Sequence, residues 1–383
     1  MIPFNKSFII GNELLYIEEA VKSGKISGDG IFTKKCQSFF QEKYQFPKVL
    51  LTTSCTDALE MAAILSNITS EDEVIVPAFT FVSTANAFVL RGAKIIFADS
   101  SIKNPNIDVD KIENLITSKT KAIVVVHYAG IACDMEKVME IAKKYNLLVI
   151  EDAAQAIDSY YVFSDGTKRA LGSIGHFAAF SFHETKNIIS GEGGMLVIND
   201  QKYFDRAEII REKGTNRSAF FRGEIDKYGW VDIGSSFLPS DIIAAFLFAQ
   251  LEKFDVIQNK RITIWNKYFH ELKELKDKGF IGIPQIPKYA TNNAHMFYII
   301  CKDEAERSNL IDAMKSVEIY PVFHYTSLNK SQFYLETNES IDYINAEKFS
   351  DRLLRLPFFY ELTNQEQEQV ISTIKYFYFK SRI

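Results

Sequence analysis

The feature that most constrains the fold is a series of short apolar runs between residues 74 and 198, separated by longer and more polar stretches. Such runs are typical of strands that are buried on both faces of a sheet. Residues 134–145 have apolar side chains at helical spacing and predict a helix between two of the runs. Strands that alternate with helices indicate an α/β fold with a largely parallel sheet covered by helices. The predicted strands are residues 74–76, 95–97, 123–126, 147–150, 177–182 and 195–198.

The pattern changes after residue 253, where a long helical stretch carries Trp265 and Tyr268 and is followed by Pro-interrupted segments. A chain of 383 residues is too long for one simple core. We therefore expect a large domain at residues 1–255 and a smaller C-terminal α+β domain at residues 256–383, with the boundary inside the long helix. The other predicted helices of this part are residues 304–317, 345–354 and 364–377.

Two strand ends carry residues of the kind that pyridoxal phosphate (PLP) requires. Lys186 follows the run at residues 177–182 and precedes a glycine-rich segment, 191–194, whose backbone can approach a ligand closely; Asp152 follows the run at residues 147–150. A carboxylate keeps the pyridinium nitrogen of PLP protonated, and a lysine binds its aldehyde and moves a proton. Taken singly, the lysine would be a solvated loop residue and the aspartate a helix N-cap. The pair together favours a PLP site.

Two further segments fit the same cofactor. Residues 51–63 form a hydroxyl-rich turn that runs into a strong helix former, and the start of such a helix attracts anions. Ser and Thr also cap helices that bind nothing, so the segment is a weak signal by itself. Its position before the first predicted strand favours a phosphate site within this turn. Phe79 and Phe81 follow the run at residues 74–76, where an aromatic ring can stack on the pyridine.

Composition excludes several other classes of protein. A net charge of −5 gives no electrostatic reason to expect nucleic-acid or membrane-surface binding. The first residues lack a cationic region followed by an apolar stretch, and no segment approaches a membrane span, so we expect a cytoplasmic enzyme. The cysteines have no CxxC spacing, which argues against a disulfide framework and against a zinc or other metal site. They are Cys36, Cys55, Cys133 and Cys301.

The motifs at residues 77–81, 151–155, 181–186 and 191–194 together resemble the DegT/DnrJ/EryC1/StrS sugar aminotransferases, which have PLP-dependent transferase fold type I. The likeness extends from the loop at residues 23–28 to residues 356–358. It implies that Lys186 is the Schiff-base lysine, that Asp152 partners the pyridinium nitrogen and that Gln155 lies against the face of the phenolic oxygen. It further implies phosphate binding by Ser181, Cys55 and Thr56, and ring stacking by Phe81.

Within the family, residues 211–218, 221–223, 226–228 and 232–236 look like the enterobacterial WecE type, the dTDP-4-amino-4,6-dideoxygalactose transaminases. This resemblance implies transfer of an amino group from L-glutamate to C4 of dTDP-4-keto-6-deoxyglucose, for enterobacterial common antigen or a related surface glycan such as O-antigen. In such an enzyme Arg217 and Arg222 would clamp the diphosphate. Taken alone, their segment would be a solvated loop.

The chain departs from the family pattern at one place. Most members carry Gly-x-Asn-x-Arg, in which the Asn reaches the cofactor phosphate of the neighbouring subunit, and here the Asn is Ser236 and the Arg is Leu238. A serine still donates a hydrogen bond, and a site shared between two chains predicts a homodimer.

Some roles and substrates stay open. His183 could move protons or simply be a hydrogen-bonded neutral side chain, and His324 with Tyr325 could contact the sugar or end a packed strand. Amination at C3, another nucleotide such as UDP, a PLP sugar 3-dehydrase and a non-catalytic binding protein are the alternatives. The dehydrases replace the Schiff-base lysine with histidine, whereas this chain keeps Lys186.

Overall fold

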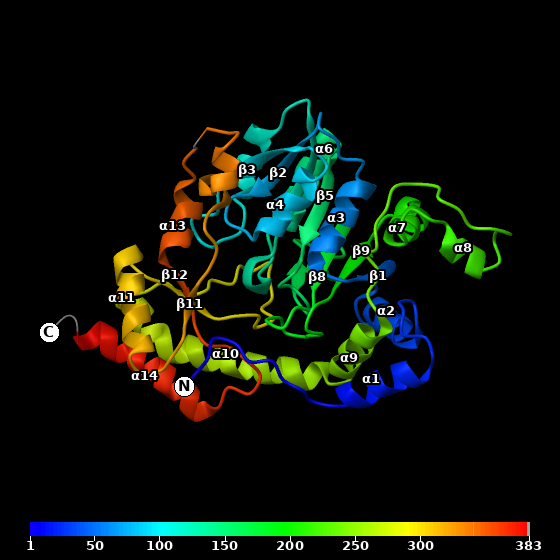
Figure 1. Cartoon of the computed structure of the whole chain (residues 1–383). Coiled ribbons are helices and arrows are strands. Elements are labelled where there is room, and N and C mark those ends of the chain that lie inside the picture. The colour runs from blue at the N-terminus through cyan, green and yellow to red at the C-terminus, as the bar shows by residue number, and fades with distance from the viewer. Residues whose placement is uncertain (340, 381–383) are drawn as a thin grey trace.

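A computed structural model describes residues 1–339 and 341–380. Its centre is a seven-stranded sheet with the order β1-β9-β8-β5-β4-β2-β3 (Figure 1). Neighbours from β8 to β3 are parallel, whereas β9 runs antiparallel to both β8 and β1. The mostly parallel sheet is therefore confirmed. The strands are β1 (Lys48–Thr52), β2 (Glu73–Pro77), β3 (Lys94–Ala98), β4 (Thr120–Val126), β5 (Leu148–Asp152), β8 (Phe177–Ser181) and β9 (Gly194–Ile198).

Strand β1 is the one strand of this sheet that the sequence pattern missed. We took residues 74–76 as the first strand, but β1 precedes them in the chain and pairs only with β9. Its short apolar run leads directly into the hydroxyl-rich turn, so it carries little signal of its own.

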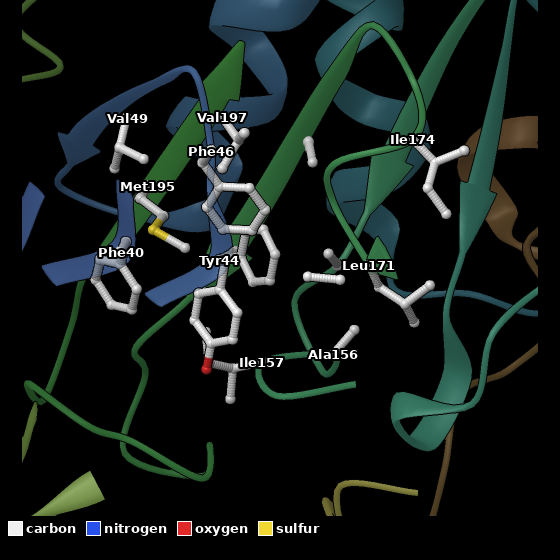
Figure 2. Close-up of a cluster of buried hydrophobic side chains, with 14 of the residues drawn as sticks. Phe40, Tyr44, Phe46, Val49, Ala156, Ile157, Leu171, Ile174, Met195 and Val197 are labelled. Carbon is white, nitrogen blue, oxygen red and sulfur yellow. The ribbon is translucent and has the colours of Figure 1, made fainter. Parts of the chain in front are cut away.

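Both faces of the sheet are covered, and successive residues of each strand point to opposite sides. On one face Val149 packs in a core with α2 (Ile31–Tyr44), α6 (Met135–Tyr145) and α9 (Asp241–Glu252). Figure 2 shows part of this core, with Phe40 and Tyr44 from α2 against Val49 of β1. On the other face Ile150 packs with α3 (Cys55–Leu65), α4 (Val82–Val89) and α7 (Phe204–Arg211). Each such buried side chain contributes roughly 1.5–3 kcal/mol, which holds the strand ends in fixed register.

The C-terminal part has its own small sheet, in the order β10-β12-β11. Its core contains Trp265, Tyr268 and residues from later helices, together with Ile2 from the N-terminus. The predicted helix at 345–354 is shorter than expected, because Leu353 and Leu354 pair with β10 and belong to β12. The division at residue 255 stays a prediction. The elements are α10 (Phe254–Asp277), β10 (Tyr298–Ile300), α11 (Glu304–Lys315), β11 (Val322–Phe323), α12 (Gln332–Leu335), α13 (Ile344–Arg352), β12 (Leu353–Arg355) and α14 (Asn364–Lys380).

A short arm around α8 (Arg217–Phe221) projects away from the body on the side of β1 (Figure 1). The remaining elements are α1 (Glu13–Lys22), α5 (Val109–Ile112), β6 (Tyr160–Val162) and β7 (Lys168–Ala170). Within residues 1–339 and 341–380, no helix combines the length and apolar character needed to cross a bilayer.

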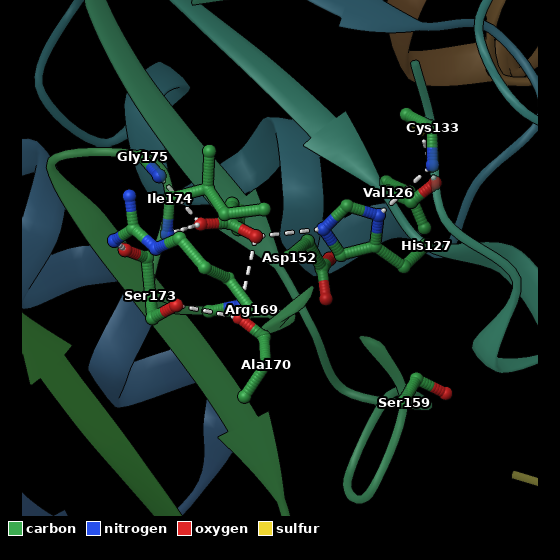
Figure 3. A network of polar contacts seen from close by, with 12 residues as sticks. Val126, His127, Cys133, Asp152, Ser159, Arg169, Ala170, Ser173, Ile174 and Gly175 are labelled. Carbon is green, nitrogen blue, oxygen red and sulfur yellow. Dashed lines mark hydrogen bonds and ion pairs between the residues drawn. The ribbon is translucent and has the colours of Figure 1, made fainter. Parts of the chain in front are cut away.

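A buried, hydrogen-bonded pair of side chains lies beneath the end of β5. The Glu151 carboxylate accepts hydrogen bonds from the backbone N–H groups of Gly172 (2.7 Å), Ile174 (2.9 Å) and Gly175 (2.6 Å). Its Oε2 also lies 2.9 Å from Nε2 of His127, and both side chains are fully buried (Figure 3). Because the N–H of Cys133 donates to Nδ1 of His127 at 3.2 Å, Nε2 carries the hydrogen that Glu151 accepts. The pair ties β5 to β4 and to the loop before β8.

We expect Glu151→Gln to destabilise the protein by about 3 kcal/mol at neutral pH, because an amide presents an N–H to backbone donors that need an acceptor. Burial alone would raise the pKa of Glu151, but the hydrogen bonds from His127 and from the N–H groups of Gly175 and Gly172 outweigh it and lower the pKa. The charged carboxylate therefore stabilises the fold above the unfolded pKa, and this contribution is lost as the pH falls through the folded pKa.

Urea unfolding of wild type and variant between neutral and acidic pH tests this expectation, with the stability difference shrinking below about pH 4. Glu274→Gln is the control, because its exposed carboxylate contacts only Lys278 and should change stability by about 0.5 kcal/mol or less. A difference between wild type and Glu151→Gln that is the same at every pH would contradict the buried charge.

Candidate active site

A cleft of about 750 Å³ opens at the carboxyl ends of the parallel strands, within the size range of cofactor sites. It lies on the face of α3 and α4, because Asp152 and Ser181 continue the row of side chains that packs against those helices. The small sheet closes its other side with residues 322–325 and Arg355, and Phe4 and Asn5 add an edge. Segments far apart in the chain thus meet at one site.

Asp152 is held firmly at the end of β5. The hydroxyl of Thr84 donates to Oδ2 at 2.6 Å, and the N–H of Ala154 donates to Oδ1 at 3.2 Å. Burial raises the pKa of this carboxyl, while the two hydrogen bonds and the charge of Lys186 work in the opposite direction. A cation placed against the carboxylate would favour its charged form. Asp152 therefore suits a protonated ring nitrogen.

Lys186 hangs from the loop that follows β8. The loop is tied together by hydrogen bonds from Ser190 N–H to Phe182 O (2.7 Å) and from Glu184 N–H to Gly191 O (2.9 Å). The N-terminal segment adds a contact from Asn5 Nδ2 to Glu184 O at 3.1 Å. Burial lowers the pKa of Lys186, although the nearby Cys55 and Asp152 oppose the shift. An amine with a lowered pKa is a better nucleophile and proton acceptor at neutral pH.

The glycine-rich segment has a different purpose from the one we expected. A Cβ on Gly194 would lie 2.4 Å from the backbone carbon of Ser54, so this glycine lets β9 pack against the start of α3. A Cβ on Gly193 would collide with Oγ of Ser190 within the Lys186 loop. The glycines at 193 and 194 therefore allow the chain to pack closely on itself, which positions α3 and Lys186.

The starts of α3 and α4 converge on one end of the cleft. Ser54 caps α3 by accepting from the N–H of Asp57 at 3.0 Å, and Oγ1 of Thr56 lies 2.8 Å from Oγ of Ser83 in the first turn of α4. Cys55, Thr56, Ser83 and Ser181 all line the cleft. Helix N-termini with adjacent hydroxyl groups form a suitable site for a phosphate.

Aromatic and amide side chains line the opposite wall. Phe79 is 1% exposed and belongs to the core, whereas Phe81 is 54% exposed and lines the cleft, as expected for a stacking ring. Phe81 and Tyr325 have ring centroids 5.9 Å apart. Gln155 accepts from the N–H of Ala129 at 2.6 Å and donates to the hydroxyl of Tyr325 at 3.1 Å. Its amide is therefore fixed in orientation within the cleft.

Two histidines of the cleft differ in character. His183 is half-exposed, and its Nδ1 lies 2.9 Å from Oγ1 of Thr185. His324 is buried and its Nδ1 lies 2.6 Å from the hydroxyl of Tyr128. Burial lowers the pKa of His324 well below its ordinary value, so this ring is neutral at physiological pH.

Three predicted site residues lie outside the cleft of their own chain. Ser236 is exposed and forms an isolated bridge with Glu212. Arg217 contacts Glu212 at 3.4 Å, and Arg222 contacts Glu208 at 2.6 Å. The structure therefore brings neither arginine to the lining of this cleft.

Some residues in or beside the cleft escaped the sequence reasoning. Thr84, which donates to Asp152, was visible only as one of two hydroxyl side chains in a mostly apolar helix. Tyr128 and His295 contribute buried polar groups, and Arg355 contributes a guanidinium from the small sheet. Because these side chains come from separate elements, no local spacing could have revealed them.

The donor set fits PLP: a helix N-terminus for the phosphate, Asp152 for the ring nitrogen, Phe81 beside the ring and Lys186 for the aldehyde. Comparison with known proteins also indicates an enzyme of the PLP-dependent aminotransferase class. Residues 8–375 match the DegT/DnrJ/EryC1/StrS aminotransferase family.

Relatives cover almost the whole chain. A GDP-perosamine synthase of Escherichia coli O157:H7 is 32% identical, with 98% of each chain covered. The spore coat polysaccharide biosynthesis protein SpsC of Bacillus subtilis is 31% identical over 98% of this chain and 96% of its own. The crystal structure of the aminotransferase TlmJ from Streptoalloteichus hindustanus superposes with a TM-score of 0.90 at 25% identity and covers both chains fully. This chain therefore belongs to the DegT/DnrJ/EryC1/StrS aminotransferase family and is a PLP-dependent aminotransferase.

Proposed function

We propose that the enzyme transfers an amino group from L-glutamate to C4 of dTDP-4-keto-6-deoxyglucose and produces dTDP-4-amino-4,6-dideoxygalactose for a surface glycan. The observation that carries the proposal is the placement of Lys186 and Asp152 in one cleft, supported by hydroxyl groups and helix N-termini for a phosphate. The resemblance of residues 211–236 to the dTDP-sugar branch supports the choice of substrate.

The residues divide the work of both half-reactions. Bound PLP supplies an electron sink that allows a proton to leave the carbon bearing the nitrogen. Lys186, whose amine has a lowered pKa, takes that proton and returns it during the opposite half-reaction. Asp152 keeps the ring nitrogen protonated, and its bonds to Thr84 and Ala154 hold it in place. Phe4, Phe81 and Phe323 give the cleft part of its apolar lining.

A GDP-linked keto sugar is the second candidate, because one of the relatives is a GDP-perosamine synthase. The two candidates differ in the nucleotide base, which is at the opposite end of the substrate from the carbon that is aminated. Amination of another carbon or of a UDP-sugar would leave the same central chemistry intact.

The substrate proposal predicts a kcat/KM for dTDP-4-keto-6-deoxyglucose about tenfold or more above those for the GDP-linked and UDP-linked 4-keto-6-deoxy sugars. Holoenzyme is incubated with glutamate and each sugar nucleotide, and the product is determined by NMR. An amine on C4 in the galacto configuration supports the proposal. A higher kcat/KM with the GDP-linked sugar would support the second candidate instead. If none of the three sugar nucleotides yields an amino sugar, both candidates are wrong.

We further propose that the enzyme works as a homodimer in which the α8 arm reaches the partner's cleft. The arm exposes large apolar side chains, among them Trp230 (83% exposed), Phe221 and Tyr228. Exposed aromatic patches of this kind mark contact surfaces. Arg217, Arg222 and Ser236 lie on or beside the same arm and outside the cleft of their own chain, which fits donation across a two-fold interface.

Mixing an inactive variant with a weakly binding one, assayed at a nucleotide-sugar concentration well below KM, tests the arm directly. Arg217→Ala should weaken nucleotide-sugar binding about tenfold or more, and Lys186→Ala should abolish turnover. When the two variants are unfolded and refolded together in equal amounts, half of the dimers contain one chain of each kind. In each mixed dimer, one of the two sites has both Lys186 and an intact arm from the partner. About a quarter of wild-type activity should therefore return. No recovery would mean that the arm serves its own chain, and a fully active monomer in light scattering would contradict the dimer.

A further inference from the structure

Arg355 is a cation of the cleft with no carboxylate partner. It ends β12, the central strand of the small sheet, and lines the cleft together with Lys186. Among the described residues, no Asp or Glu oxygen lies within 4 Å of its guanidinium. Its Nη2 donates to the carbonyl of Phe323 at 3.3 Å, while Nε is buried and makes no hydrogen bond. The guanidinium carbon lies 4.5 Å from the centroid of the Phe4 ring.

Other buried arginines of the chain find more acceptors within the protein, although Nε of Arg211 and Nε of Arg307 also make no hydrogen bond. Arg211 forms a two-pronged ion pair with Asp29 at 2.7 and 2.9 Å. Arg307, which lies over the ring of Phe323, donates to the carbonyl of Ser350 at 2.6 Å and pairs with Glu304 at 3.3 Å. Arg261 donates to the carbonyls of Ala294 and His295. In contrast, most of the five N–H donors of Arg355 have no protein acceptor.

The charges around Arg355 show which kind of ligand it would attract. Burial lowers the pKa of Arg355, yet a guanidinium stays protonated at neutral pH. Its charge reaches the amine of Lys186, where it adds to the effect of burial in lowering the pKa. Of the carboxylates that line the cleft, Asp152 accepts from Thr84 and Ala154, and Glu192 is mostly exposed and lies near His183. An anion is therefore needed to satisfy Arg355.

We propose that Arg355 binds the α-carboxylate of the amino donor and so turns the donor's amino group toward Lys186. A guanidinium fork pairs with the two oxygens of a carboxylate through parallel hydrogen bonds. The inference rests on the aminotransferase function proposed above, because glutamate and the keto sugar must occupy the same cleft in turn.

The position of Arg355 favours the carboxylate over the diphosphate of the sugar nucleotide. The α-carboxylate is attached to the same carbon as the reacting nitrogen, so its anchor must lie close to Lys186, as Arg355 does. In a hexose aminated at C4, the diphosphate on C1 lies across the ring from the reacting carbon. An anchor for the diphosphate would therefore lie farther from the lysine.

The test compares holoenzyme of wild type, Arg355→Gln and Arg355→Lys, with Arg307→Gln as the matched control. Arg307 is also a guanidinium beside Phe323, but it lies outside the lining of the cleft. The probe for the donor site is α-methylglutamate, which carries the α-carboxylate but lacks the proton that is removed. The probe for the diphosphate site is dTDP. Calorimetry gives a dissociation constant for each probe, and melting of the unliganded protein reports on folding.

We expect Arg355→Gln to raise the dissociation constant of α-methylglutamate about tenfold or more and that of dTDP by less than about twofold. Arg355→Lys should lie in between, since an ammonium keeps the charge and loses the fork. The Tm of Arg355→Gln should stay level or rise, because an unpaired buried charge has been removed. Arg307→Gln should leave both dissociation constants unchanged.

Unchanged affinity for α-methylglutamate, or equal weakening of both probes, would overturn the assignment, and a lower Tm with both affinities reduced would show a structural role. A different result would contradict the proposed function alone. If the wild-type enzyme binds α-methylglutamate through Arg355 but aminates no keto sugar, the proposed reaction is wrong and the assignment of Arg355 is still supported.

Discussion

The site depends on the alternation of side chains at the end of β5. Glu151 and Asp152 are consecutive buried carboxylates, and the pleat of the strand sends them to opposite faces of the sheet. Glu151 accepts hydrogen bonds from His127 and three backbone N–H groups within the protein, so it fixes the strand end. Asp152 keeps its charge available to the cleft. A shift of one residue in register would exchange the two roles and destroy the site.

The charges of the cleft share one property: burial opposes each of them. It raises the pKa of Asp152 and lowers the pKa of Lys186 and of Arg355. A group that brings the complementary charge relieves this cost, so the protein's electrostatics select a cationic ring at Asp152 and an anionic substrate group at Arg355. The fold maintains these unfavourable charges because two packed cores hold the surrounding strands.

The sequence reveals the features that depend on neighbouring residues and misses those that depend on residues far apart in the chain. The apolar runs at 147–150 and 177–182 are buried on both faces, so they predicted β5 and β8, and with them the strand ends that carry Asp152 and Lys186. Edge strand β1 and the strand β12 at the end of a helix were missed, because pairing with a distant partner defines them. Thr84 and Arg355 were missed for the same reason. The glycine-rich segment was expected to let the backbone approach a ligand, and the close neighbour of Gly194 in the structure is the backbone at the start of α3.

The central claim is that Lys186, at the end of β8 and facing Asp152 across the cleft, is the lysine that holds the cofactor. Reduction of the holoenzyme with borohydride, followed by peptide mass spectrometry, tests it most directly. The account predicts one pyridoxyl group, on the peptide that contains Lys186, and none in a Lys186→Ala variant that still folds. A pyridoxyl group on another lysine of the wild-type enzyme would contradict the account.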